Sequence, residues 1–539
     1  MQSYMAILKN SSKKHNIIFL MFLVIFWILG VYLLKYYQYS ISGQDLISVI
    51  SIGQLYAEGD LHNAINGYWG PLFSWLLVPF LLFKSSQSFA LYSTKILSLI
   101  IGFFTLIGIR FLSYRFEMDE KIRLSILFLM IFVVLYFSLI PSFFPMDLLL
   151  LCFLVYYLYF IFDPNYSDKL FNGFVCGILG AMAYLTKEYA LPFFIVHFVL
   201  FNMFHYVNDI SRVKRRKILK NFAIGIVVFF IIAGAWSAII SDKYGKITTG
   251  TAGQYNYELV GPDSQGIPMW NGFMKPTNDK AITTWEDPSY DKLIKWSPFH
   301  SVKNFIFQLT IIGNNIIKTI GIIQTFSIFA ILILIAYIVV CIQPPRKLIS
   351  DTDYLYPLTT ILLFIGGYIL VFVEFRYLIL VNILLILMGG YLINKLFKKT
   401  SLTDIGKIVL IILFISSFIL LPVTSITQEI NEGMYIYNLS NILSNQYNIH
   451  GNLASNGENS QYYTSEGVAY FLNSPYYGTN LINWKISSDS ELENNFIKYK
   501  IDYYLLWDNS TANINLLSKY KEVTNGTIAG LKVYAINGR

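Results

Sequence analysis

Charged residues are scarce in this chain of 539 residues, because Asp, Glu, Lys and Arg together make up only 13% of it. A water-soluble domain carries roughly 25% charged residues. Instead, apolar runs of about 20 residues, the length that crosses a hydrocarbon core of about 30 Å, recur along most of the sequence. The hydrophobic fraction is 55% and the mean hydropathy is +0.53. This composition predicts an integral, multi-span α-helical membrane protein.

Residues and motifs of several common active sites are also few. The three cysteines all lie in apolar runs, so neither a disulfide framework nor a zinc site is indicated. The histidines show no metal-ligand spacing, and no Walker-type glycine loop or GxSxG elbow is present. No cofactor is indicated, although a divalent metal stays possible.

The basic residues cluster in short segments between the apolar runs, which is typical of cytoplasmic loops of membrane proteins. The net charge of +8 is therefore no sign of a nucleic-acid partner. Lys9, Lys13 and Lys14 precede the first apolar run and predict a cytoplasmic N-terminus. That run lacks a small-residue cleavage site, so we expect it to be a retained anchor in the cell membrane.

Alternation of basic loops with apolar runs predicts about eleven membrane spans and an extracytoplasmic C-terminus. We expect the spans at about 17–36, 89–112, 124–140, 148–162, 171–185, 189–206, 222–240, 320–340, 356–373, 378–396 and 405–421. This topology puts the dense basic clusters on the cytoplasmic side of the membrane. It puts the following residues at the outer face: Asp45, Asp147, Lys187, Glu188, Glu374, Arg376 and Tyr377.

The first outer loop, residues 42–88, is too polar to cross a bilayer and too apolar to be a free loop. Residues 44–58 fit an interfacial helix with its polar residues on one side, ended by Gly59-Asp60. Residues 71–83 are apolar but short for a span, and we expect a second interfacial or re-entrant helix there.

Two further outer regions accompany a transmembrane domain at residues 1–424. The large loop at 241–302 has no clear periodicity, which favours a functional or disordered segment over scaffold. Residues 425–539 predict a small extracytoplasmic α/β domain, with a helix at 491–500, a buried strand at 501–507 and a hairpin turn at Asn525-Gly526.

The charges at the outer ends of the spans can be interpreted in two ways. Residues at helix ends can simply reach the interface. Alternatively, both signs meet in a site for an anionic, membrane-embedded substrate. There Arg376 and Lys187 would bind a phosphate and a carboxylate would act as general base. Glu374 would either orient Arg376 or pair with Lys187.

Tryptophans are frequent in the outer loops, where they predict an aromatic belt at the membrane interface or, as the less favoured alternative, rings that stack on sugars. They are Trp69, Trp75, Trp270, Trp285 and Trp296.

At four places the chain resembles the GT-C superfamily of membrane glycosyltransferases, in particular the protein O-mannosyltransferases and the lipid A aminoarabinose transferases. These places are GQDLISVISIGQLYAEGDLHNAINGYWGPLFSWLLVP, FPMDLLL, LTKEYALPF and FRYLILVN. The chain departs from the family pattern at Leu46, where a second acid is common, and at Val381-Asn382, where prolines usually follow.

The resemblance implies transfer of one hexose or pentose from a polyprenyl-phosphate donor to a lipid, glycan or protein acceptor at the outer face. It implies that Asp45 is the catalytic base and that Asp147 orients the acceptor or shares that role. Lys187 and Arg376 would contact the lipid phosphate, supported by Glu188, Glu374 and Tyr377.

Two alternatives remain open from the sequence. A polysaccharide polymerase or ligase would also carry a large outer loop. A transporter of lipid-linked substrates is the other, but transporters usually show internal repeats and mid-membrane charges, whereas no repeat is found here.

Overall fold

The computed structural model describes residues 13–41, 43–140, 144–209, 211–342, 352–482, 485–508 and 513–537. The chain forms two compact units from interleaved segments. Unit 1 comprises Met1–Lys35, Ile96–Ile239 and Ser301–Ile430. Unit 2 comprises Tyr36–Lys95, Ile240–His300 and Asn431–Arg539. Lys9 lies outside the described residues.

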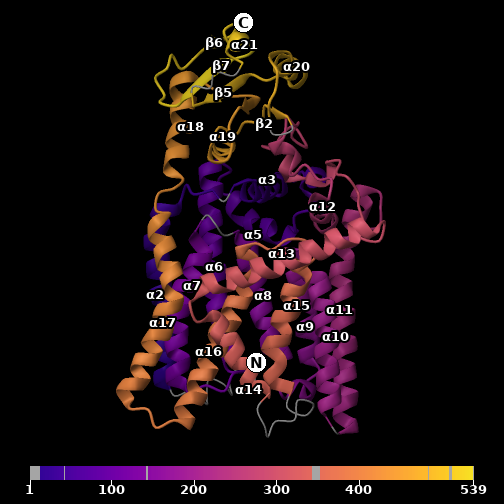
Figure 1. The fold of residues 1–539 in the computed structure, drawn as a ribbon, viewed down its shortest axis with the longest axis vertical. Helices are drawn as coiled ribbons and strands as arrows, with labels where there is room; N and C mark the ends of the chain where they lie inside the picture. The colour runs from indigo at the N-terminus through magenta and orange to yellow at the C-terminus, as the bar shows by residue number, and fades with distance from the viewer. Residues whose placement is uncertain are drawn as a thin grey trace. The chain divides into compact units, whose positions relative to one another are not determined.

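Unit 1 consists largely of apolar helices (Figure 1). They are α2 (Lys13–Tyr37), α6 (Gln87–Ser113), α7 (Glu120–Leu139), α8 (Pro145–Ile161), α9 (Phe171–Thr186), α10 (Ala190–Asn208), α11 (Arg212–Tyr244), α13 (Val302–Phe326), α14 (Ala330–Ile342), α15 (Tyr356–Ile369), α16 (Ile379–Lys399) and α17 (Asp404–Gln428), with the short 3-10 helices η1 (Tyr166–Asp168), η5 (Thr352–Leu355) and η6 (Phe375–Leu378).

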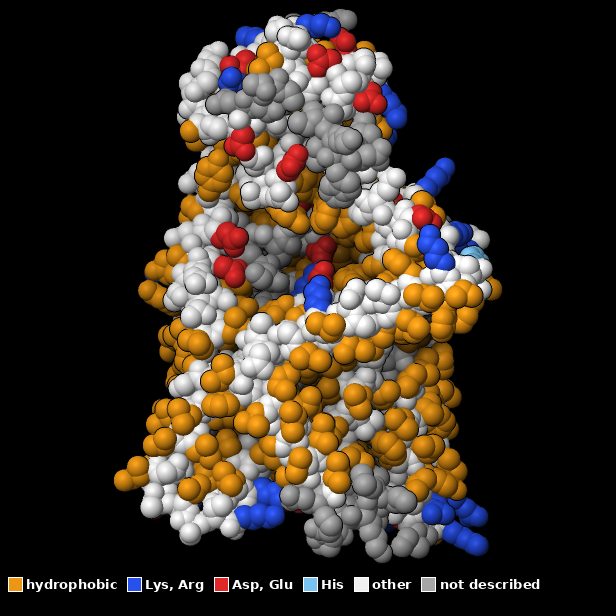
Figure 2. Space-filling view, in the orientation of Figure 1, with side chains coloured by type: hydrophobic (Ala, Val, Ile, Leu, Met, Phe, Trp, Pro, Cys, Tyr) orange, Lys and Arg blue, Asp and Glu red, His pale blue; other side chains and the backbone are white. Residues whose placement is uncertain are grey.

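Eight of the described helices are long and apolar enough to cross a membrane, and shorter apolar helices occur at α8, α9, α14 and α15. Hydrophobic side chains cover the surface of unit 1 in Figure 2, and Lys and Arg side chains gather at one end of this unit. The prediction of a multi-span helical protein is confirmed, while the number of crossings stays a prediction.

The single helix expected at 320–340 is wrong, because α13 ends at Phe326 and α14 begins at Ala330. Ser327 between them has an extended backbone, with φ −166° and ψ 145°. Its hydroxyl lies 2.8 Å from the Ser417 hydroxyl on α17 and accepts the Phe329 N–H at 3.0 Å. A serine hydroxyl that accepts a hydrogen bond from a nearby backbone N–H competes with the hydrogen bonds of a continuous helix.

Helix α13 is amphipathic, and its buried side includes two amides that bind the end of α15. Gln308 donates to the Leu370 carbonyl at 2.9 Å. Asn315 donates to the carbonyls of Ile369 and Val371 at 3.0 and 3.1 Å. These are carbonyls that a helix end leaves without intrahelical partners. Helix α13 therefore supplies hydrogen-bond donors for the backbone carbonyls that precede η6.

Glycines let α9 and α11 approach closely. A Cβ added at Gly173 or Gly177 on α9 would meet backbone atoms of Asn221 or Gly225 on α11. The four-residue spacing of Gly173 and Gly177 is typical of close helix packing in membranes. By contrast, a Cβ on Gly234 of α11 would meet nothing within 4 Å.

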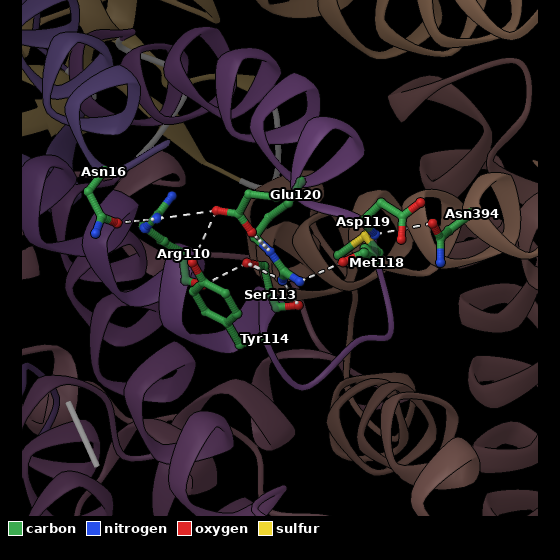
Figure 3. A network of polar contacts seen from close by, with 9 residues as sticks. Asn16, Arg110, Ser113, Tyr114, Met118, Asp119, Glu120 and Asn394 are labelled. Carbon is green, nitrogen blue, oxygen red and sulfur yellow. Dashed lines mark hydrogen bonds and ion pairs between the residues drawn. The ribbon is translucent and has the colours of Figure 1, made fainter. Parts of the chain in front are cut away.

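A polar network holds the loop between α6 and α7 (Figure 3). Arg123 donates to the carbonyls of Ser113 and Met118 at 2.7 and 2.8 Å. Glu120 lies between two guanidinium groups, 2.9 Å from Arg123 and 3.4 Å from Arg110. Arg110 and Arg123 are therefore buried and paired.

Unit 2 contains the first outer loop. Helix α3 (Gln44–Glu58) has the expected bounds and ends at Gly59, whose φ of 79° suits glycine. It is followed by α4 (Leu61–Ala64) and α5 (Pro71–Leu81). Helix α5 and η3 pack around α3. This packing explains why Ile47, which does not fit a one-sided amphipathic helix, is only 1% exposed.

The large outer loop is ordered and joins the C-terminal residues within unit 2. It forms α12 (Ala252–Leu259), η2 (Pro268–Trp270), η3 (Thr284–Glu286) and η4 (Pro288–Tyr290). Phe273 bridges to Gly478 in the C-terminal sheet, and the Met274 N–H donates to the Tyr477 carbonyl at 2.8 Å. Strand β2 (Tyr476–Thr479) of the C-terminal sheet is thus packed with this loop.

The C-terminal part of unit 2 is a mixed α/β fold. Its helices are α18 (Met434–Tyr447), α19 (Ser460–Phe471), α20 (Asp489–Tyr499) and α21 (Ile514–Leu517). Its strands are β1 (Leu453–Ser455), β2 (Tyr476–Thr479), β3 (Leu481–Ile482), β4 (Lys485–Ile486), β5 (Tyr503–Trp507), β6 (Lys521–Glu522) and β7 (Leu531–Ala535).

Five of these strands form one sheet in the order β2-β1-β5-β7-β6. Strand β1 runs parallel to β2 and β5, and β7 runs antiparallel to β5 and β6. The expected helix, buried strand and hairpin correspond to α20, β5 and the β6–β7 pair. The boundary expected at residue 425 stays a prediction.

The close contact of α9 and α11 predicts a specific sensitivity. Gly177→Ala should lower the free energy of unfolding by about 1–3 kcal/mol, because the added methyl group overpacks a backbone contact. Thermal unfolding of the purified protein in detergent measures this loss. Gly234→Ala on α11 is the matched control and should leave the midpoint unchanged or raise it. Equal midpoints for the two variants would contradict the packing described.

Candidate functional site

Five of the predicted site residues come together in unit 1, around Asp147. Asp147 lies in the first turn of α8, after Pro145 at the first helical position. The helix dipole there favours a negative charge. The side chain is only 2% exposed, so its charge needs a partner within the protein.

Lys187 is that partner. It directly follows the last residue of α9, and its Nζ lies 2.6 Å from Asp147 Oδ1. The ammonium group also lies 4.1 Å from the centre of the Tyr377 ring, a cation–π contact. Helices α8 and α9 pack closely against each other, which brings together two residues that are 40 positions apart.

Arg376 completes the cluster from η6. Its Nε lies 3.9 Å from Asp147 Oδ2 and 2.6 Å from Glu374 Oε2. Among the described residues, Asp147 Oδ2 has no hydrogen-bond partner. Of the two partners expected for Glu374, the structure shows Arg376, and the role of Glu374 in orienting it stays a prediction. Two cations and two carboxylates thus meet at one place.

Aromatic rings form one side of this cluster. Tyr377 stacks on Tyr368, which stacks on Tyr189, with ring centres 4.6 and 3.8 Å apart. A small cavity is lined by Asp147, Arg376, Tyr368 and Tyr377, and by apolar residues of α8, α15 and α16. Glu188 lies next to Lys187, where its charge faces Tyr184.

Asp45, the seventh predicted residue, belongs to unit 2. It lies in the first turn of α3, directly after Gly43 and Gln44, and Gly43 has a φ of 67°. The Trp285 indole N–H donates to Asp45 Oδ1 at 2.8 Å. The carboxylate is half-buried, and its orientation is fixed by an indole that is itself 4% exposed.

Tryptophans of the outer loops build the surroundings of Asp45. The Trp69 indole donates to the Trp285 carbonyl at 3.0 Å, and the Trp270 indole donates to Gln44 Oε1 at 3.2 Å. Trp69, Trp285 and Trp296 are all less than 10% exposed. For these three, an aromatic belt facing lipid is therefore wrong, because they pack inside unit 2. Trp75 is 38% exposed.

Comparison with solved structures identifies the fold. The crystal structure of ArnT from Cupriavidus metallidurans in the apo state matches 95% of this chain and 97% of its own, with a TM-score of 0.57 and 11% identity. The chain has the GT-C fold. The oligosaccharyltransferase AglB from Archaeoglobus fulgidus, in complex with an inhibitory peptide and a dolichol-phosphate, matches 91% of this chain and 69% of its own, with a TM-score of 0.47 and 11% identity.

No family model and no curated protein matches the sequence. The GT-C fold confirms the resemblance derived from the four sequence segments. Together with the apolar helices, it makes the chain a multi-pass membrane protein.

The structure also buries acids that the sequence analysis did not single out, among them Glu286 and Glu466. Burial raises the pKa of Glu286 to about 8, although the Ile282 N–H donates to it at 2.7 Å. Burial, and then the charge of Asp45, raises the pKa of Glu466 well above its usual range. The one sequence signal for Glu466 is that it is the single acid of α19.

Within the described ranges, no group of three or more His, Cys, Asp and Glu side chains is placed to hold a metal ion.

The buried pair of Asp147 and Lys187 gives a testable prediction for unit 1. Lys187→Met leaves Asp147 without its 2.6 Å partner, and we expect a loss of about 2–3 kcal/mol in the free energy of unfolding. Thermal unfolding in detergent measures it, and adding Asp147→Asn to Lys187→Met should restore part of the loss. The control is Lys398→Met, since Lys398 and Asp119 form an exposed pair at 3.9 Å and should contribute less than about 1 kcal/mol. Similar losses for both lysine variants would contradict this account.

Proposed function

We propose that this protein is a membrane glycosyltransferase that moves one hexose or pentose from a polyprenyl-phosphate donor to a lipid, glycan or protein acceptor. The cluster of Asp147, Lys187 and Arg376 on a chain with the GT-C fold carries this proposal. We place the reaction at the outer face of the cell membrane, with a cytoplasmic N-terminus and an extracytoplasmic C-terminal domain, in cell-envelope glycosylation.

Lys187 and Arg376 are suited to bind the phosphate of the donor. A guanidinium group can form two parallel hydrogen bonds to phosphate, and an ammonium group acts as a point charge. Both cations are paired with carboxylates in the structure, at 2.6 Å in each case. A phosphate would share these cations, and Glu374 and Asp147 would keep them in position. Tyr377 covers Lys187 on one side.

Asp45 is suited to act as the general base. As the acceptor oxygen or nitrogen attacks the anomeric carbon, its proton passes to the Asp45 carboxylate. The bond between the anomeric carbon and the phosphate oxygen breaks, and the polyprenyl phosphate leaves with the bonding electrons. The new bond forms on the opposite face of the sugar, with inversion. The Trp285 N–H holds the carboxylate in one orientation, which general-base catalysis requires.

Asp147 has a supporting role in this reaction. It is buried and its Oδ1 is bound to Lys187, so it holds the phosphate-binding ammonium in place. Negative charge that develops on the departing phosphate would be stabilised by the Lys187 and Arg376 cations.

Asp45→Asn should reduce sugar transfer by at least about 100-fold, because it removes the proton acceptor and leaves a side chain of the same shape. The assay measures transfer from labelled polyprenyl-phosphate sugars in membranes that contain the protein. Asp60→Asn is the matched control. Asp60 lies on the same outer loop and caps α4, a role that Asn fills equally well. Full activity of Asp45→Asn would overturn the assignment of the base, and failure of the wild type to use any such donor would count against the class.

Arg376→Gln should raise the KM for the donor by about 10-fold or more, since a hydrogen bond to a charged group contributes about 1.5–3 kcal/mol. Arg376→Lys keeps the charge but loses the paired geometry, and its KM should lie between those of Arg376→Gln and the wild type. Lys398→Gln removes an exposed cation elsewhere in unit 1 and serves as the control. A donor KM that is the same in wild type and Arg376→Gln would exclude a phosphate contact.

A further inference from the structure

Glu466 is an unusual residue for a folded domain. It lies in the middle of α19 and is 0% exposed. Neither of its carboxyl oxygens has a hydrogen-bond partner among the described residues. More than about 90% of buried polar groups in proteins are hydrogen-bonded, so a carboxyl group with both oxygens unbonded needs an explanation.

The position of Glu466 connects the C-terminal fold to Asp45 within unit 2. Helix α19 packs against α3, the helix that begins with Asp45 (Figure 1). Trp270 joins the same two helices, since its ring lies against Tyr462 of α19 while its N–H donates to Gln44 of α3. The carboxyl of Glu466 is close enough to Asp45 to sense its charge.

The groups around Glu466 keep it uncharged. The titratable neighbours are Asp45 on α3, Tyr462 on its own helix and Tyr476 on β2. None of them is a cation, and Asp45 repels a second negative charge. Burial acts in the same direction and raises the pKa of Glu466. Both effects favour the carboxylic acid form, which has one O–H donor and one acceptor oxygen.

We propose that Glu466 is a specificity-determining residue of the Asp45 site, whose carboxylic acid hydrogen-bonds a hydroxyl group of the transferred sugar. A sugar hydroxyl both donates and accepts a hydrogen bond, so it satisfies both functions of the acid at once. An anionic ligand group would be repelled by Asp45. The inference rests on the proposed function and adds that the C-terminal fold takes part in sugar recognition.

The unpartnered Glu466 also predicts opposite effects of its replacement on stability and on activity. A buried acid without partners destabilises the ligand-free fold, and sites kept for function often carry such a cost. Replacing it with an apolar residue of similar size should relieve that cost. A structural acid would show the reverse, because its removal would weaken the fold.

The test uses the full-length protein with Glu466→Leu, Glu466→Gln and the exposed control Glu458→Gln. Glu466→Leu should raise the donor KM by about 10-fold or more, with a smaller change in kcat, and its thermal unfolding midpoint should equal or exceed that of the wild type. Glu466→Gln keeps a donor and an acceptor and should stay within about 3-fold of the wild-type KM. Glu458→Gln should change neither quantity.

The pH dependence of KM separates this role from a structural one. In the wild type, the donor KM should rise at high pH, because the acid then loses the proton that it donates. Glu466→Gln cannot titrate and should lose this alkaline rise. The same rise in both proteins would overturn the proposal, as would a Glu466→Leu variant with a lowered midpoint and an unchanged KM.

The unfolding measurement does not depend on turnover. If the wild type transfers no sugar from any polyprenyl-phosphate donor, the proposed function fails, whereas a lowered midpoint of Glu466→Leu refutes the inference about Glu466 by itself. A raised midpoint supports the view that Glu466 is kept for a ligand.

Discussion

The structure depends on one constraint, the free-energy cost of burying an ionisable group. An isolated buried charge costs several kcal/mol or more. Buried groups meet this constraint in two ways. Some are paired with an opposite charge, as Asp147 is with Lys187 at 2.6 Å in unit 1 and Asp287 is with Lys243 at 3.5 Å in unit 2. For Glu286 and Glu466 in unit 2, burial instead favours the protonated form, and the pKa values of both are raised.

This difference also separates the proposed roles. Paired charges remain ions and can exchange a partner for a phosphate, which suits the cluster around Arg376. A protonated acid offers a hydrogen bond and carries no charge, which suits recognition of a neutral hydroxyl group by Glu466. Asp45 is intermediate in its burial, since it is half-buried, and the Trp285 N–H donates a hydrogen bond to it. A base must be able to gain a proton, and a tight ion pair would oppose that gain.

Much of the fold could be predicted from the sequence, because apolar runs that end at charged or turn residues define helices locally. The helix at 44–58 ended where Gly59 predicted. The break at Ser327 could not be predicted, because it depends on contact with Ser417, 90 positions away. The residues of the unit 1 cluster were predicted from charge alone, but their pairing was not, because it depends on how α8 packs against α9. Glu466 was missed, since nothing local distinguishes it from an exposed helical acid.

The contact of α13 with the end of α15 has a mechanical consequence. Helix α13 presents bulky apolar side chains on its outer side, among them Phe305, Ile306 and Leu309. Its inner side donates hydrogen bonds to carbonyls at positions 369–371, five residues or more before Arg376, and Phe326 at its end packs on Phe375. A lipid bilayer that pulls on α13 therefore pulls on the segment that carries the guanidinium.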